Sequence, residues 1–271
     1  MRTALTIAGS DPSGGAGIQA DLKTFAAFGL YGASAITAIT AQNTLGIAAT
    51  LALQADLVTA QIEAVAGDLT IDATKVGMLA NAAIVEAVVA AIAELDLPLV
   101  VVDPVLVSSS GERLLDEDGV RALTAELLPR ARVVTPNLPE AEALSGRRID
   151  SPEAAREAAR RIHDMGAAAV IITGGHGTTH AERRTPNDEV VDLVFDAGSF
   201  FELRVPRVES RHTHGTGCTF ASAVAAGLAL GLELPEAAAR AQRYVAGAIL
   251  HAPGVGHGRG PLDHFWQRRS G

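Results

Sequence analysis

Short runs of aliphatic and β-branched residues alternate with longer segments of helical periodicity along almost the whole chain. The run "TALTIAG" at 3–9 has the composition of a strand. Over the following 17–29, Ile18, Leu22 and Phe25 recur at the spacing of one helix face. Such alternation is typical of a mostly parallel sheet with helices on both faces. The sequence therefore predicts an α/β fold.

The same patterns place the other elements. Antiparallel additions are expected at 46–53 and in a hairpin over 190–206 that turns at "DAGS". No segment has the composition of a linker, so we expect one domain over 1–271. The remaining expected strands cover 33–41, 73–78, 98–105, 132–137 and 168–175, and the remaining helices cover 55–69, 82–95, 116–128, 138–146, 151–166, 216–231 and 235–251.

Composition excludes several functional classes. The net charge is −9 and 48% of the residues are hydrophobic, which argues against a general nucleic-acid binder. The single cysteine rules out an internal disulfide and favours a reducing compartment. The N-terminal apolar run is too short for a signal peptide, and no apolar run is long enough to span a membrane. We therefore expect a cytoplasmic protein with no membrane and no nucleic-acid partner.

A glycine-rich turn at 9–17, "GSDPSGGAG", nominally matches a dinucleotide fingerprint. Its glycines come too late after the expected strand, and the acidic residue expected about 20 positions further on is missing. The chain also lacks the Gly-x-x-x-x-Gly-Lys-Ser/Thr motif of P-loop enzymes. Neither a Rossmann dehydrogenase nor a P-loop NTPase is therefore favoured.

The turn "HGTGC" at 214–218 is the stronger signal. Gly215 and Gly217 allow successive backbone N–H groups to face one space, and the helix that follows adds its positive dipole end. This arrangement predicts an anion hole. The only cysteine, Cys218, lies at the start of that helix, where a thiol pKa is expected to be lowered.

Eight sequence blocks resemble one branch of the ribokinase superfamily, the hydroxymethylpyrimidine/phosphomethylpyrimidine kinases of thiamine biosynthesis. The blocks follow the order of that family from residue 7 to 265. They are "IAGSDPSGGAGIQADLKTF", "TAITAQNTLG", "TKVGML", "VVDPVLVSSSG", "TPNLPEAEAL", "GGH", "THGTGCT" and "VGHGRGPLDHF". The first block together with "HGTGCT" is highly specific.

The resemblance implies a ribokinase-like three-layer sandwich. It also implies a homodimer that uses ATP and Mg²⁺ to phosphorylate 4-amino-5-hydroxymethyl-2-methylpyrimidine and then its monophosphate. The implied catalytic group is Cys218 as base with Gly215, Thr216 and Gly217 as the cradle of the transferring group. The implied substrate residues are Gln42, Ala16, Asp21, Met78 and Val105. Asn137 and Thr213 would contact ATP phosphates. Asp103 and Glu140 would lie near Mg²⁺ and contact it directly or through a bound water.

The chain departs from the family at two lysine positions. Ser109 and Thr173 stand where many members carry a lysine that could neutralise phosphate. Arg113, or Mg²⁺ alone, could supply the missing positive charge, and the sequence does not decide between them.

Other interpretations stay open at this point. The chain could be a pyridoxal kinase of the same superfamily, or a non-catalytic pyrimidine sensor. Individual residues also have structural interpretations: Cys218 as packing, Asp21 as a solvent-facing helix residue, Glu140 as a first-turn charge and Met78 as core.

Overall fold

A computed structural model describes residues 1–108, 111–174 and 189–269. Its described strands form one sheet in the order β3-β2-β1-β4-β5-β6-β7-β8-β9. The strands are β1 (Thr3–Ser10), β2 (Tyr31–Asn43), β3 (Gly46–Ala52), β4 (Ala73–Val76), β5 (Val100–Val102), β6 (Val133–Val134), β7 (Ala169–Ile172), β8 (Glu189–Asp196) and β9 (Ser199–Pro206).

The centre of the sheet is parallel and its edges are antiparallel. Strands β2, β1, β4, β5, β6 and β7 pair in parallel. Strand β3 pairs antiparallel with β2 at one edge, and the β8–β9 hairpin continues β7 antiparallel at the other. Both antiparallel additions were expected from the sequence. The prediction of a mostly parallel α/β sheet with minor antiparallel additions is confirmed.

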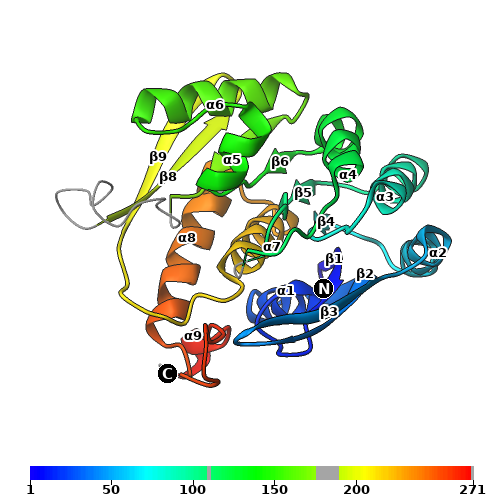
Figure 1. Ribbon diagram of the computed structural model, residues 1–271, viewed down its shortest axis with the longest axis horizontal. Coiled ribbons are helices and arrows are strands. Elements are labelled where there is room, and N and C mark those ends of the chain that lie inside the picture. Colours follow the sequence, from blue (N-terminus) through cyan, green and yellow to red (C-terminus); the bar gives the residue numbers. More distant parts are fainter. Residues whose placement is uncertain (109–110, 175–188, 270–271) are drawn as a thin grey trace.

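Two layers of helices cover the two faces of the sheet (Figure 1). One apolar core lies under α2, α3, α5 and α6, and a second lies under α1, α7 and α8. Within β5, Val101 contributes to the second core and its neighbours Val100 and Val102 to the first, because successive strand side chains point to opposite faces.

The helices have the following bounds: α1 (Gly17–Ala27), α2 (Ala55–Ala66), α3 (Ala82–Glu94), α4 (Glu117–Ala122), α5 (Leu138–Ser145), α6 (Pro152–Asp164), α7 (Thr216–Ala229), α8 (Leu234–Leu250) and α9 (Trp266–Arg269). The helix expected over 116–128 is continuous, but its hydrogen-bonding pattern changes along its length. It begins as α4, widens to a π-helix η1 (Leu123–Leu127) and tightens to a 3₁₀ turn η2 (Leu128–Arg130). Pro129 cannot donate a helical hydrogen bond, so the regular helix does not continue through it.

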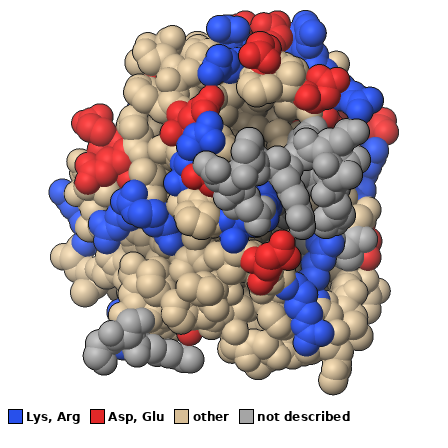
Figure 2. All heavy atoms as spheres, turned by 90° about the vertical axis from the view of Figure 1, so that its left-hand side faces the viewer, with Lys and Arg blue, Asp and Glu red and all other residues tan. Residues whose placement is uncertain are grey.

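The side of the molecule that carries the β8–β9 hairpin and α8 mixes basic and acidic side chains rather than separating them by sign (Figure 2). This side therefore does not present the uniformly basic surface that nucleic-acid binding uses. Among the residues described, no helix has the length and apolarity needed to cross a membrane.

Candidate functional site

A cavity of about 640 Å³ lies at the carboxyl ends of the parallel strands, facing the start of α7. Asp11 follows β1, Met78 follows β4 and Asp103 follows β5. Gln42 lies at the carboxyl end of β2. Open α/β sheets bind ligands at this edge, because the loops that leave parallel strands converge there. The cavity is called the first cavity below.

A second cavity of about 560 Å³ lies beside it, bounded by the β8–β9 hairpin, the segment 207–213 and helix α8. Asp192 of β8 lines it and is deeply buried. Burial raises the pKa of Asp192 to about 6, although hydrogen bonds from the Gly174 N–H and Gln242 act in the opposite direction. The two cavities share a border that we call the seam. Six of the residues that border both cavities are Asp103, Asn137, Glu140, Thr213, Thr216 and Gly217.

The turn before α7 is built by close backbone packing. Gly215 has a φ of 83°, and a Cβ there would lie 1.9 Å from the carbonyl oxygen of Gly15. Only glycine fits at that position, because any side chain would collide with the loop that follows β1. Thr216 and Gly217, the first residues of α7, border the seam, so the start of a helix lies beside both cavities. The anion hole stays a prediction.

Gly217 is different, because the predicted need for glycine at this position is not found. It has no left-handed backbone, and a Cβ there would lie 3.8 Å from both carboxylate oxygens of Asp103, an ordinary contact distance. Gly217 therefore leaves open space beside a carboxylate rather than permitting a turn.

Cys218 lines the first cavity and is half-buried, but its predicted low pKa is wrong. Burial raises the pKa of the thiol to about 12. The positive charge of Lys75 lowers it, and the nearby carboxylates Asp103 and Asp21 raise it. Desolvation of the thiolate therefore outweighs the helix end that the sequence argument relied on.

Asp21 lines neither cavity, and its full burial contradicts the solvent-facing alternative, while its role as a substrate residue stays a prediction. It is fully buried in α1, where the Thr6 and Ser222 hydroxyls donate to its carboxylate at 2.6 and 2.7 Å. Lys75 Nζ, also fully buried, lies 3.0 Å from its Oδ2. Although burial disfavours the ammonium ion, the charge of Asp21 raises the Lys75 pKa, so Lys75 stays protonated.

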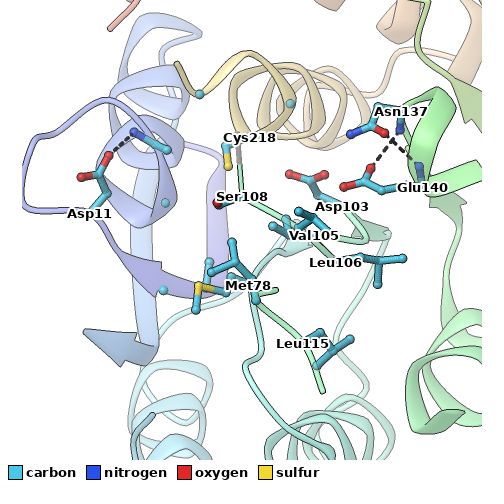
Figure 3. Close-up of a pocket in the computed structure, with 18 of the residues that line it drawn as sticks. Asp11, Met78, Asp103, Val105, Leu106, Ser108, Leu115, Asn137, Glu140 and Cys218 are labelled. Carbon is cyan, nitrogen blue, oxygen red and sulfur yellow. Dashed lines mark hydrogen bonds between the residues drawn. The ribbon is translucent and has the colours of Figure 1, made fainter. Parts of the chain in front are cut away.

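Asp103 and Glu140 point toward one another across the seam (Figure 3). Lys75 Nζ lies 3.9 Å from Asp103 Oδ2, beyond hydrogen-bond distance, and that buried oxygen has no hydrogen-bond partner. Burial raises the pKa of Asp103 to about 6 despite Lys75, and burial with the Asp103 charge raises the pKa of Glu140 to about 8. Two close carboxylates that both resist ionisation are stabilised by a cation between them.

This pair fits Mg²⁺, which prefers oxygen ligands and keeps several waters. Within the described residues no cluster of three or more metal-binding side chains occurs, so direct ligation would rest on few protein atoms.

Glu140 also serves as a helix cap. Its carboxylate accepts from the Asn137 N–H at 2.9 Å, and Asn137 Oδ1 accepts from the Glu140 N–H at 3.0 Å. Glu140 therefore caps α5 and also borders both cavities, so its structural and functional interpretations are compatible.

Gln42 lines the first cavity next to His214. Its side-chain Nε2 lies 3.4 Å from His214 Nε2, and its Oε1 lies 3.1 Å from the hydroxyl of Thr40. His214 Nε2 is in turn 2.8 Å from Asp11 Oδ2. The contact with the Thr40 hydroxyl holds the Gln42 amide at the wall of the first cavity.

The other predicted residues are also placed. Ala16, Met78 and Val105 line the first cavity together with Gln42, and Asn137 and Thr213 border the seam. Met78 is buried and lines the cavity, so the core and pocket interpretations both describe it. Thr173 lines the second cavity and brings no positive charge. Arg113 lines the first cavity and pairs with Glu117 at 3.1 Å, while Ser109 lies outside the described residues.

Sequence reasoning did not find Lys75, Asp11 or His214. A signal for Lys75 was available, because a lysine inside a buried parallel strand must have a charged partner. Asp11 and His214 lie in turns whose side-chain directions the sequence does not reveal.

Comparison with known proteins extends this picture. The family model for phosphomethylpyrimidine kinase matches residues 11–263. The chain is 45% identical to the hydroxymethylpyrimidine/phosphomethylpyrimidine kinase of Bacillus subtilis over 98% of this chain and 96% of that one. It is 47% identical to the thiamine biosynthesis bifunctional protein ThiED of Geobacter sulfurreducens over 96% of this chain, but it spans only 52% of that longer protein.

Solved structures show the same fold. The ADP complex of Bacillus subtilis pyridoxal kinase superposes with a TM-score of 0.88 at 37% identity, covering 99% of both chains. The phosphomethylpyrimidine kinase of Clostridium difficile superposes with a TM-score of 0.79 at 39% identity, covering 92% of this chain and 100% of that one. The chain thus has the ribokinase-like architecture and belongs to the phosphomethylpyrimidine kinase family of phosphotransferases.

Proposed function

We propose that this chain transfers the γ-phosphoryl group of ATP to the hydroxymethyl oxygen of 4-amino-5-hydroxymethyl-2-methylpyrimidine and then phosphorylates the monophosphate to the diphosphate, for thiamine biosynthesis. The observation that carries the proposal is the meeting of two cavities at the glycine-built turn before α7. A kinase needs this arrangement, because acceptor and donor must approach one another in line.

The first cavity suits the pyrimidine. Gln42 offers an amide to the polar edge of the ring. The apolar side chains of Met78 and Val105 can contact the faces of the ring (Figure 3). An aminopyrimidine presents a donor next to an acceptor, which an amide can match with both of its groups. The hydroxymethyl group would then extend toward Cys218 and the seam.

The second cavity suits ATP, with its phosphates at the seam. The start of α7 offers backbone N–H groups to the transferring phosphoryl group, and Asn137 and Thr213 border its path. Asp103 and Glu140 would hold Mg²⁺, directly or through water, and the ion would neutralise charge on the phosphates. Most of the catalysis then comes from positioning and charge stabilisation.

The acceptor of the hydroxyl proton is proposed to be Cys218, whose thiol has a pKa raised to about 12 by burial. It can accept a proton only after ligand binding lowers its pKa, and the buried Lys75 charge acts in that direction. Its neighbour Asp103 is the alternative acceptor, and the Cys218 variants described below separate the two.

Pyridoxal is a second candidate acceptor, favoured by the close superposition on a pyridoxal kinase. A third possibility is a non-catalytic pyrimidine sensor, which would not need the glycine-built turn that this chain carries before α7. We further propose that residues 1–271 form one kinase domain that acts as a cytoplasmic homodimer. Light scattering on the purified protein tests the oligomeric state.

A coupled ADP-release assay with hydroxymethylpyrimidine, its monophosphate and pyridoxal as separate acceptors tests the function. We expect ADP release with both pyrimidines and a lower kcat/KM with pyridoxal. A higher kcat/KM with pyridoxal than with the pyrimidines would instead identify a pyridoxal kinase. Pyrimidine binding without ADP release would instead indicate the sensor.

A further inference from the structure

A seventh residue borders both cavities, and it is an arginine. Arg259 lines the first cavity and the second, and it is the only Lys or Arg side chain at the seam among the described residues. The other six seam residues include two carboxylates and no cation. A seam that receives polyphosphate needs positive charge, and Thr173, which lines the second cavity, supplies none.

The backbone of Arg259 is fixed on two sides. Its N–H donates to the Thr44 carbonyl at 2.9 Å, on the turn between β2 and β3. The carbonyl of the next residue, Gly260, accepts at 3.2 Å from the N–H of His214, the first residue of the 214–218 turn. The segment therefore joins a wall of the first cavity to the turn that forms the anion hole.

The glycines beside Arg259 allow this close approach. A Cβ at Gly258 would lie 2.0 Å from the Thr44 carbonyl oxygen, and a Cβ at Gly260 would lie 2.3 Å from His212 Nδ1. Any larger residue at either position would push the segment away from its supports. The sequence "GRG" thus places one long cationic side chain at a rigidly held point over the seam.

We propose that Arg259 is a catalytic residue whose guanidinium contacts the phosphates at the seam and matters most for the second phosphorylation. This inference rests on the proposed function. In the first step the acceptor is a neutral alcohol. In the second step the acceptor is itself a phosphate, so two anions must approach each other. A guanidinium that can reach both cavities can hydrogen-bond to both anions at once.

Kinetics of Arg259→Ala with each acceptor test the proposal. A charge-assisted hydrogen bond to phosphate predicts a fall in kcat/KM of about 10- to 150-fold for the first step. We expect a fall at least about tenfold larger for the monophosphate acceptor, because repulsion between two anions is then unscreened. Arg259→Lys should recover part of the loss, and added guanidinium should restore activity to Arg259→Ala in a saturable way.

Two comparison variants make the result specific. Arg148→Ala removes an exposed arginine that lines neither cavity and should behave as the wild type. Arg113→Ala removes the arginine that lines only the first cavity. If Arg113→Ala shows the larger loss in the second step while Arg259→Ala does not, the proposal is overturned.

Calorimetric titration with ADP and with adenosine gives a readout that needs no turnover. Arg259→Ala should weaken ADP binding by at least about tenfold and leave adenosine binding and the thermal midpoint unchanged. Equal weakening of both ligands, or a lowered midpoint with no rescue by lysine or guanidinium, would make Arg259 a structural support and overturn the proposal. If the wild type binds ADP but phosphorylates neither pyrimidine, the proposed function fails while this titration still decides the role of Arg259.

Discussion

The imidazole Nε2 of His214 lies 2.8 Å from Oδ2 of Asp11, although 203 positions separate the two residues in the chain. Both side chains are buried. Burial alone would raise the pKa of Asp11, but hydrogen bonds from His214 and Ser13 outweigh it and lower the pKa to about 2. An ionised carboxylate only accepts, so His214 Nε2 carries the proton. The contact ties the loop after β1 to the turn before α7.

Asp11→Ala should therefore lower the free energy of unfolding in a pH-dependent way. The folded pKa lies below the unfolded value of 3.8, so the stabilisation is complete above about pH 4 and is lost as the pH falls toward 2. The shift corresponds to about 2 kcal/mol at pH 7. Urea unfolding at pH 7 and pH 3 measures the difference between variant and wild type, which should shrink in acid. Asp164→Ala, at an exposed carboxylate, is the control.

Cys218 should alkylate more slowly than a free cysteine in the ligand-free protein. Its pKa of about 12 leaves very little thiolate at neutral pH. The logarithm of the iodoacetamide rate should rise with unit slope from pH 7 to pH 10, without a plateau. Because the chain has one cysteine, the mass of the intact protein reports the reaction directly. A plateau near pH 7 would show that the thiolate is stabilised after all.

Turnover of Cys218→Ala then tests whether the thiol takes part in the reaction. A positioned base contributes about 10²–10⁴ to kcat, so we expect a loss in that range with unchanged KM for ATP. Cys218→Asp, with a carboxylate at the same place, should keep part of the activity. If Cys218→Ala turns over at the wild-type rate, the thiol only packs against its neighbours, and Asp103 is then the proton acceptor.

The two glycines of the anion turn should respond differently to the same substitution. Gly215→Ala forces a methyl group to within 1.9 Å of the Gly15 carbonyl oxygen at a φ of 83°, so the turn must move. Gly217→Ala only adds a methyl group at 3.8 Å from the Asp103 carboxylate. We expect Gly215→Ala to abolish measurable turnover and lower the thermal midpoint, and Gly217→Ala to reduce kcat with an unchanged midpoint. Equal midpoints for the two variants would contradict the assigned geometry.

Gln42→Leu should weaken the use of the pyrimidine more than the use of ATP. Leaving a buried polar group of the ligand unpaired costs about 1–3 kcal/mol, which is about 5- to 150-fold in kcat/KM. The KM for ATP should stay within about twofold, because Gln42 lines only the first cavity. Gln54→Leu, at an exposed position before α2, serves as the matched control. An unchanged kcat/KM for hydroxymethylpyrimidine would remove Gln42 from the substrate site.

Periodicity predicted the elements well wherever burial was regular. The alternation of Val100, Val101 and Val102 between two cores is what a buried parallel strand requires, and the 151–166 pattern became α6 with Ser151 as its N-cap. The 116–128 pattern did not specify a uniform helix, because its geometry changes over the last turns before Pro129.

The site was predictable only where a motif carried it. The resemblance named six residues that the structure gathers at the seam, whereas Asp21 proved to be buried behind it. Periodicity could assign Asp21 to a helix but could not tell which neighbours its carboxylate would meet. The raised thiol pKa of Cys218 was unpredictable for the same reason, since it depends on burial and on charges from three other elements.

Lys75 and Asp21 form a fully buried ion pair, and removing one partner should cost far more than removing both charges. Lys75→Met leaves the Asp21 carboxylate without its counter-charge and should lower the free energy of unfolding by about 3–5 kcal/mol. Adding Asp21→Asn should recover most of that loss, because the Thr6 and Ser222 hydroxyls can still bond to the amide. Urea unfolding of both single variants and the double variant gives the coupling energy directly. Additive losses would show that the two charges do not depend on one another, and that Lys75 is held in place by packing alone.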